Sequence, residues 1–276
     1  MGFFKTFFGG KEESPEEKKK RDDAHNFDVL KTDGVRALHV GQSPYAVKCF
    51  EKALEITDDL ETRDYLAQAL IRCDRLDEAR KQLNILSEAQ PDNIHILMMM
   101  ARVDYMMEDY NHMSQVCEKA TLIDSDNADV MFLYARASQG QGDLVNAVAM
   151  FTKAIMLNPE LGDAYLERGR LLLRMGDLEG AEEDAAHLMD VAPKVEDVLL
   201  FRAKVHVARQ EMSEAADTYS EAIEVNPFCI EAFKGRGAAR LALGDKDGAE
   251  SDMKQLLELD PDVLKDISGE YKNENQ

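Results

Sequence analysis

The stretch AYLERGRLLLRMGDLEGAEEDAAHLMDVAP, residues 164–193, decides the fold of this chain of 276 residues. Its two halves each carry apolar residues at helical spacing, and Gly176-Asp177 stands between them. Glycine readily ends a helix because it adopts the left-handed backbone conformation, and the polar residue after it begins the turn. Gly169 and Ala181 are small side chains, which let two helix backbones approach closely. The stretch therefore predicts a hairpin of two antiparallel helices.

The same pattern recurs along most of the chain. Pro159, Pro193, Pro227 and Pro261 stand 34 residues apart, and Pro91 lies two such periods before Pro159. A fixed period of this length indicates stacked helical repeats. When each unit is counted from three residues past this proline, seven units result, of which the first is one residue shorter: 27–59, 60–93, 94–127, 128–161, 162–195, 196–229 and 230–263.

Several positions of the unit show which side chains pack together. Position 8 is always glycine or alanine, and position 20 is alanine in every unit except the third, which has Met113. Where position 24 is bulky, position 27 is alanine, and the fifth unit reverses this order with Ala185 and Leu188. Such compensation keeps the volume of one packed layer near native density. Because no segment alternates with period two, we predict an all-α chain with fourteen helices between residues 27 and 263.

These units resemble the tetratricopeptide repeat (TPR) family. That family has a small residue at position 8, an aromatic or small one at position 11, alanine at positions 20 and 27, an aromatic at position 24 and proline at position 32. The match is best in the stretch quoted above and in AFKGRGAARLALGDKDGAESDMKQLLELDP, residues 232–261. The third unit departs most, with Met113, Cys117 and Ser125 at positions 20, 24 and 32. The resemblance implies a right-handed superhelical solenoid of antiparallel helix pairs, with a concave groove and a role as a protein-interaction scaffold.

Charge and composition argue against several other classes of protein. The formal net charge of −21 repels nucleic-acid phosphates, so no nucleic-acid partner is expected. No apolar run approaches the roughly 18 to 20 residues of a membrane-spanning helix, and the apolar start is too short for a secretory signal, which favours the cytoplasm. The four cysteines are far apart and form no CxxC pair, so we expect reduced, mostly buried thiols.

We expect no enzyme, no cofactor and no metal. Only residues 1–26 and 264–276 lie outside the seven units, and neither segment is long enough for a catalytic domain. None of the six histidines has a second His or Cys at metal-ligand spacing, and the sequence contains no HExxH, GxSxG or glycine-rich phosphate loop. Leu264, Ile267 and Tyr271 share one helical face, which suits a short C-terminal cap on the last unit.

The first ten residues, MGFFKTFFGG, differ from everything after them. Phe3, Phe4, Phe7 and Phe8 would share one face of a short helix, followed by a flexible charged stretch over residues 11–23. This face is a candidate contact with a membrane surface or a partner, which would make the protein membrane-peripheral. The alternatives are a cap folded onto the first unit and disorder.

The resemblance places positions 2, 5, 9, 12 and 13 of each first helix in the groove. Over units three to seven these positions form a mixed apolar and basic stripe, which favours a partner segment with acidic residues and apolar anchors. The candidate groove residues are Met98, Arg102, Tyr105, Phe132, Arg136, Leu166, Arg170, Leu173, Arg174, Leu200, Lys204 and Lys234, with Met106, Val207 and Leu241 at equivalent positions.

The charges on and beside this stripe have two interpretations. The cations at position 9 are flanked by acids at position 2, Asp129, Asp163, Asp197 and Glu231, so they either pair within the chain or contact a ligand. A second set of arginines at position 7 is expected to be structural. Asp184 and Asp252 at position 23 are placed to pair with Arg168 and Arg236 across the hairpin.

One branch of the family binds the C-terminal tails of chaperones through a clamp of lysine, asparagine and arginine at fixed groove positions. Units five to seven carry Leu166, Arg170, Phe201, Glu231 and Gly235 there, so chaperone tails are not the expected partner. We therefore predict a non-catalytic scaffold that holds a peptide or helix of another protein in its groove. The alternative is an assembly subunit or structural protein that acts through end-to-end or convex-face contacts.

Overall fold

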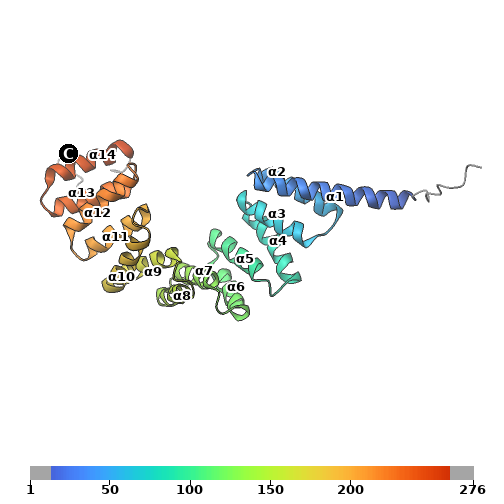
Figure 1. Ribbon diagram of the computed structural model, residues 1–276, viewed down its shortest axis with the longest axis horizontal. Coiled ribbons are helices and arrows are strands. Elements are labelled where there is room, and N and C mark those ends of the chain that lie inside the picture. The colour runs from blue at the N-terminus through green and yellow to red at the C-terminus, as the bar shows by residue number, and fades with distance from the viewer. Residues whose placement is uncertain (1–13, 262–276) are drawn as a thin grey trace, which may run out of the picture. The chain divides into compact units, whose positions relative to one another are not determined.

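The computed structural model describes residues 14–261, and these residues form fourteen α-helices and no strand (Figure 1). The predicted all-α fold is thereby confirmed. The helices follow one another as Pro15–His39 (α1), Ser43–Ile56 (α2), Leu60–Arg72 (α3), Leu76–Ala89 (α4), Ile94–Met106 (α5), Tyr110–Ile123 (α6), Ala128–Gly140 (α7), Leu144–Leu157 (α8), Gly162–Met175 (α9), Leu178–Val191 (α10), Glu196–Ala208 (α11), Met212–Val225 (α12), Ile230–Ala242 (α13) and Lys246–Leu259 (α14).

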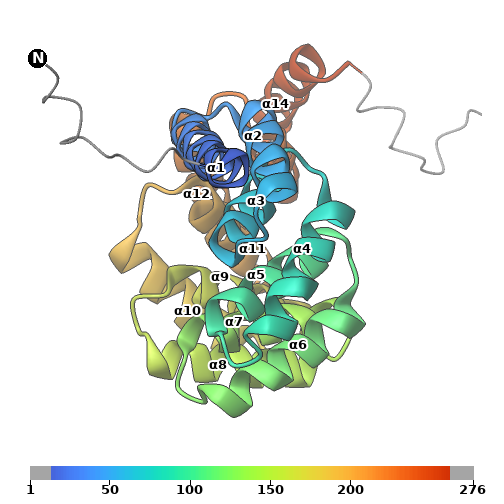
Figure 2. The same ribbon diagram turned by 90° about the vertical axis from the view of Figure 1, so that its right-hand side faces the viewer.

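The helices group into two compact units. The first contains α1 to α6 and the second contains α7 to α14, with the division between Ser125 and Asp126. Within each unit every helix packs against the next one in the chain, as α1 and α2 do in both views (Figures 1 and 2). In the second unit α11 also touches both α9 and α13. The first helices of the last three hairpins therefore lie next to one another.

The helix starts follow the repeat period. From α3 onward, each odd-numbered helix begins on the first residue of a predicted unit, for example α9 at Gly162 and α13 at Ile230. The division into seven repeats stays a prediction, because the contacts separate only two larger units.

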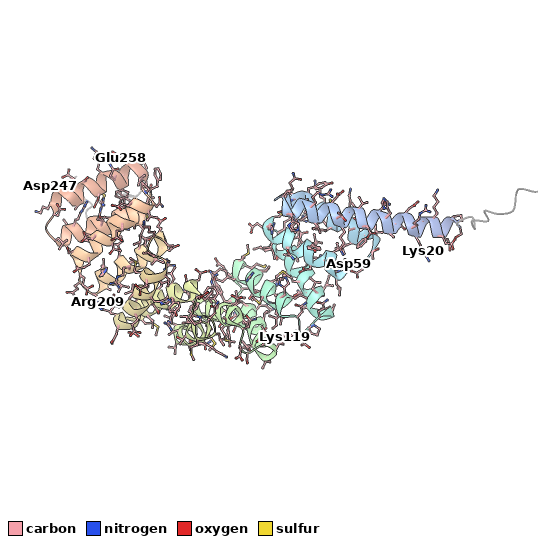
Figure 3. All side chains as sticks on the ribbon, in the orientation of Figure 1. Lys20, Asp59, Lys119, Arg209, Asp247 and Glu258 are labelled. Atoms are coloured by element: carbon pink, nitrogen blue, oxygen red, sulfur yellow. The ribbon has the colours of Figure 1, made fainter. Side chains whose placement is uncertain are left out.

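The start of α1 differs from the sequence expectation. We expected a flexible charged stretch over residues 11–23, and this is wrong for residues 15–23, which are helical. Ser14 Oγ accepts a hydrogen bond from the backbone N–H of Glu17 at 3.2 Å, and Glu17 Oε2 accepts one from the Ser14 N–H at 2.8 Å. This reciprocal cap, with Pro15 in the first turn, starts the helix early. Lys20 projects from these added turns (Figure 3).

The layer of compensating volumes is buried as expected. Phe50 and Phe151 at position 24 have no exposed surface, and neither does Ala185, which takes that position in the fifth unit. A Cβ atom on Gly169 would lie 2.4 Å from Phe201 Cζ, so a ring of the next hairpin occupies the space that glycine leaves. The small residues at position 8 thus allow contact between hairpins as well as within them.

The turn within each hairpin requires a left-handed residue. Gly142, Gly176 and Gly244 adopt φ values of 81°, 85° and 86°. The equivalent residues Glu108 and Gln210 adopt φ values of 57° and 64° without being glycine. Because side chains disfavour this conformation, these turns carry local strain.

Two buried ion pairs join the helices of their hairpins, as the sequence predicts. Arg168 donates from Nε and Nη2 to the Asp184 carboxylate at 3.0 and 2.5 Å. Arg236 makes the equivalent pair with Asp252, and the shortest of its bonds is 2.6 Å. Both arginines also donate to a hydroxyl of the preceding hairpin, Arg168 to Thr152 at 3.1 Å. These arginines therefore fix one hairpin against the next.

The third arginine of this set, Arg202, behaves differently. The residue at position 23 of its own hairpin is Thr218, which carries no charge. Arg202 pairs instead with Glu182 on α10 of the preceding hairpin. The repeat register thus predicts the partner only where an acid stands at position 23.

Some predicted features lie outside the described residues. Phe3, Phe4, Phe7 and Phe8 fall in residues 1–13, and the predicted C-terminal cap falls in residues 262–276. Among the helices between residues 14 and 261, none combines the length and the apolar character needed to cross a membrane.

Candidate functional site

The predicted groove residues divide between the two units. Met98, Arg102 and Tyr105 lie on α5 in the first unit, and the other nine lie on α7, α9, α11 and α13 in the second. Each group is therefore described as a separate surface.

The surface on α5 is partly apolar. Met98 is half-buried, Met106 is exposed, and the Tyr105 ring meets the Tyr110 ring edge to face with centroids 6.1 Å apart. Arg102 is exposed and forms no ion pair with another described residue. Spacings of four and seven residues place Met98, Arg102 and Tyr105 on one helical face.

On α7 the side chain of the candidate groove residue Phe132 is held by its neighbours. Its ring packs edge to face against the buried Phe151 ring, with centroids 5.5 Å apart. The Arg136 guanidinium carbon lies 5.7 Å from the centroid of Phe132, which is the geometry of a cation–π contact. Phe132 therefore stays half-buried, with part of its ring open to contact.

Two of the cations at position 9 form ion pairs within the chain. Arg170 Nη2 lies 2.7 Å from Asp197 Oδ1, and Lys204 pairs with Glu231. In both cases the acid belongs to the first turn of the next odd-numbered helix. The pairing interpretation therefore holds at these two positions. Because the Asp197 side chain is 66% exposed, a ligand could displace this pair at a cost of about 0.2–1 kcal/mol.

The prediction that Leu200 lies in an accessible groove is wrong. It is only 7% exposed, and it belongs to a buried cluster with Leu199, Ala203 and Tyr219. The reason is that α11 packs against α9, α10, α12 and α13, which buries most of its circumference. Leu166 and Leu173 on α9 are half-buried and pack against the neighbouring core cluster.

An accessible surface remains along the first helices of the second unit. It consists of Leu173, Arg174, Val207, Lys234 and Leu241, and we call it the α9–α11–α13 face. Val207 is 37% exposed and Leu241 is 60% exposed. Arg174 and Lys234 are exposed, and neither forms an ion pair with another described residue. The face thus offers apolar contact flanked by two available cations.

A charge cluster around the buried Asp104 in the first unit was not predicted from the sequence. His112 Nδ1 lies 2.7 Å from Asp104 Oδ2, and Arg80 Nη2 lies 2.9 Å from Asp109 Oδ2. Burial raises the pKa of Asp104, while His112 and Arg80 oppose that shift. The signal in the sequence is an aspartate at position 11, where the family has an aromatic or small residue.

Asp104, Asp109 and His112 each offer one metal-ligand atom, and these atoms lie within 4.8 Å of one another. Arg80 already supplies positive charge to the same group, with its Nε 3.6 Å from Asp104 Oδ1. The guanidinium offsets part of the carboxylate charge, and His112 already lies within hydrogen-bond distance of Asp104. We therefore assign this cluster to internal charge pairing.

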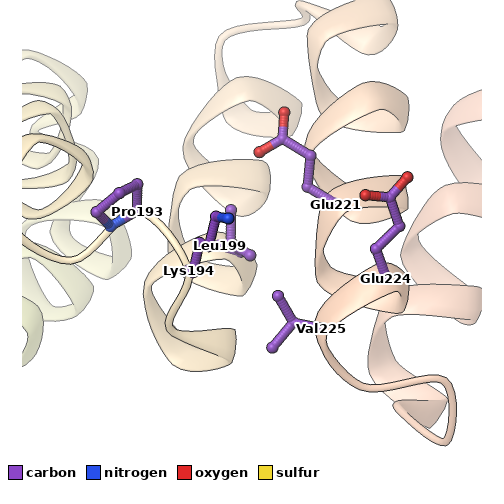
Figure 4. Close-up of a pocket in the computed structure, with 6 residues that line it drawn as sticks. All are labelled: Pro193, Lys194, Leu199, Glu221, Glu224 and Val225. Atoms are coloured by element: carbon purple, nitrogen blue, oxygen red, sulfur yellow. The ribbon is translucent and has the colours of Figure 1, made fainter.

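Sequence reasoning also missed two pockets. One, of about 200 Å³, lies in the first unit between α3, α4 and α5 and includes Asp64 and His95 in its lining. The other, of about 560 Å³, lies in the second unit between the α10–α11 loop and α12 (Figure 4). Both depend on how neighbouring hairpins fill the space between them, which a pattern within one repeat does not show.

Comparison with known protein families identifies the repeat. The tetratricopeptide repeat family matches residues 41–103, 138–188 and 200–263, which together make up more than half of the chain. The chain belongs to the tetratricopeptide repeat family. Comparison with curated proteins finds no match.

Solved structures show the same fold at low sequence identity. A tetratricopeptide repeat protein from Parabacteroides merdae matches with a TM-score of 0.70 and 15% identity, over 88% of this chain and 97% of that one. PilW, a type IV pilus biogenesis factor, matches with a TM-score of 0.66 and 16% identity, over 73% and 94%. YrrB, a TPR protein with an unusual peptide-binding site, matches with a TM-score of 0.57 and 15% identity, over 66% and 94%. Likeness at this level of identity establishes the fold.

Proposed function

We propose that this protein is a scaffold that holds an acidic, partly apolar segment of a partner protein on the α9–α11–α13 face. Tetratricopeptide repeats indicate a protein-interaction scaffold, and the peptide-binding site of YrrB is a precedent on the same fold. The observation that carries the proposal is the combination of exposed Val207 and Leu241 with the available cations Arg174 and Lys234.

The electrostatics of the chain favour an acidic segment at this face. The net charge of −21 repels acidic ligands at long range. At physiological salt the Debye length is about 8 Å, so the distant acids are largely screened while contacts with Arg174 and Lys234 are not. The partner's apolar side chains would rest on Leu173, Val207 and Leu241, where burial of apolar surface contributes about 25 cal/mol per Å² before ordering costs.

The test is capture of partners by two charge-reversed variants. Arg174→Glu combined with Lys234→Glu should abolish capture of the partner set that the unchanged chain retains. The matched control is Lys246→Glu combined with Lys254→Glu, which reverses two exposed lysines on α14 and should leave capture unchanged. Circular dichroism of both variants serves as the check that they are folded. Equal capture by all three proteins would exclude this face as the binding site.

A second variant tests the apolar part of the face. Leu241→Ser removes the most exposed apolar side chain of the surface without opening the core. If the partner's apolar side chains rest on Leu241, this substitution should weaken the binding free energy by about 2 kcal/mol, the size typical of a binding hot spot. A change within measurement error would mean that the cations act alone.

One observation favours the alternative, an assembly subunit that acts through convex contacts. Val145 and Met156 on α8 are 71% and 77% exposed, and a spacing of eleven residues places them on the same helical face. The equivalent residues of α10 are Glu179 and Asp190, whose charged side chains favour contact with water over contact with another protein surface. Sedimentation at several protein concentrations, with Met156→Lys for comparison, distinguishes the two: mass that rises with concentration only in the unchanged chain supports assembly.

A further inference from the structure

The pocket beside the α10–α11 loop shares no residue with the α9–α11–α13 face. Pro193, Lys194, Leu199, Glu221, Glu224 and Val225 line a volume of about 560 Å³ (Figure 4). Leu199 lies at the bottom and is only 1% exposed, whereas Val225 on the wall is 44% exposed. The pocket is therefore open to solvent above an apolar floor.

The neighbouring hairpins fill the equivalent space with an aromatic ring. Leu199 stands at position 4 of its unit, where the preceding unit has Tyr165 and the following unit has Phe233. Tyr165 stacks on His187 with ring centroids 4.0 Å apart. Phe233 forms a buried cluster with Leu256, and Leu259, the counterpart of Val225, packs against this cluster. An aromatic side chain thus fits this space twice within the same molecule.

Two substitutions and one changed ion pair in the sixth unit leave the space open. Leucine replaces the ring at position 4, and Glu221 stands where the fifth unit has His187. In the neighbouring units the arginine at position 7 covers the ring, as Arg168 does 5.6 Å from the centroid of Tyr165. Arg202 instead pairs with Glu182, so no guanidinium covers Leu199 in this way. The pocket results from these coordinated changes.

The charge at the pocket is negative. Glu221 and Glu224 are exposed, and neither carboxylate pairs with another described residue. In Figure 4 both carboxylates extend from α12 on one side of the pocket. Lys194 on the opposite side carries the only positive charge of the lining. The two free carboxylates complement a ligand that brings cations next to its apolar group.

We propose that this pocket is a second docking site, which takes an aromatic side chain flanked by lysine or arginine from a partner protein. The ring would occupy the space that Tyr165 and Phe233 fill in the adjacent hairpins. The flanking cations would pair with Glu221 and Glu224. This ligand has the opposite charge to the segment proposed for the α9–α11–α13 face, so the two sites select different segments.

The probe is a short synthetic peptide with one phenylalanine between two lysines, titrated into the full chain. With leucine and valine methyl groups labelled for NMR, the methyl signals of Leu199 and Val225 should shift on binding. Those of Val207 and Leu241 should not. Replacing the phenylalanine of the peptide by alanine should weaken binding at least fivefold, because the ring then no longer fills the pocket.

Two variants of the protein test the contacts. Glu221→Gln combined with Glu224→Gln should weaken binding of the probe at least fivefold, whereas the control Glu179→Gln with Glu183→Gln, on the N-terminal half of α10, should change it less than twofold. Val225→Lys, at a position that is 44% exposed, should also weaken binding. The pair Arg174→Glu with Lys234→Glu should bind the probe unchanged, which separates this site from the other proposal.

Three outcomes overturn the proposal. The first is absence of shifts at Leu199 and Val225, which would show that the probe does not enter the pocket. The second is equal weakening by the control pair, which would mean general attraction to an acidic chain. The third is equal binding of the alanine peptide, which would show that the ring contributes nothing.

Discussion

Replacing Arg168 by methionine should destabilise the protein far more than the same change at Arg170, two residues further along α9. Arg168 donates two hydrogen bonds to Asp184, whose side chain is 2% exposed. Arg170 pairs with Asp197, whose side chain is 66% exposed. Methionine keeps most of the aliphatic stem in both variants, so the comparison isolates the charge and its burial.

The burial of the partner sets the expected magnitudes. Without Arg168, the Asp184 carboxylate would remain in the core with no compensating charge, which typically costs about 3–5 kcal/mol. The loss of the hydrogen bond to Thr152 adds to this cost. Without Arg170, the Asp197 carboxylate returns to water, and the cost is about 0.2–1 kcal/mol. Since a domain is stable by only about 5–15 kcal/mol, the first change is a large fraction of the total.

The assay is urea denaturation followed by circular dichroism at neutral pH, with hydrogen exchange of the α9 and α10 amides to locate the weakened region. Stability in a repeat protein is a sum of local terms, so the loss at Arg168 should concentrate in these helices. Adding Asp184→Leu to Arg168→Met should restore much of the loss, because no buried charge remains. Equal midpoint shifts for the Arg168 and Arg170 variants would refute the reasoning.

Three further predictions concern the turns, the thiols and the packed layer. Gln210→Gly should raise the free energy of unfolding by about 1 kcal/mol, because glycine relieves the strain of φ 64°; a lower denaturation midpoint would show that the side chain matters more than the backbone. Burial raises the pKa of Cys117 to about 12 and of Cys229 to about 11 from the ordinary 9.0, so the native state holds these thiols protonated. The contribution of these two protonated thiols to the free energy of unfolding is complete below pH 9 and is lost as the pH rises towards 11 and 12. Mass spectrometry after thiol labelling at pH 8 should find that native Cys73 is modified first, because it is the one cysteine that is not fully buried. Ala215→Trp should cost about 1–3 kcal/mol by overpacking a position with no exposed surface, and an unchanged midpoint would contradict the assigned register.

Much of the fold follows from the sequence because the decisive contacts lie within one hairpin. The glycines at 142, 176 and 244 mark three of the turns, and each of them has a positive φ. The pair between Arg168 and Asp184 was predictable because positions 7 and 23 face each other across the same two helices. The early start of α1 was also readable, since Ser14 and Glu17 have the spacing of a capping box.

The candidate sites depended on contacts between hairpins, which a repeat pattern does not specify. The sequence placed Leu200 on an accessible face, but the packing of α11 against four helices buries it. For Lys204 the sequence left pairing and ligand contact open, and the structure pairs it with Glu231 of the next hairpin. Arg202 pairs with Glu182 of the preceding hairpin, because Thr218 at position 23 of its own hairpin carries no charge.

The sequence by itself therefore determined the helices, their pairing and the two ion pairs of Arg168 and Arg236 within their hairpins, because helical periodicity and the repeat register act over short distances along the chain. Only the tertiary structure decided which side chains remain accessible and where space is left between hairpins. The open pocket above Leu199 shows why: a leucine in place of a ring is a small change in the pattern, and whether it leaves a cavity depends on all the neighbours that could have filled it.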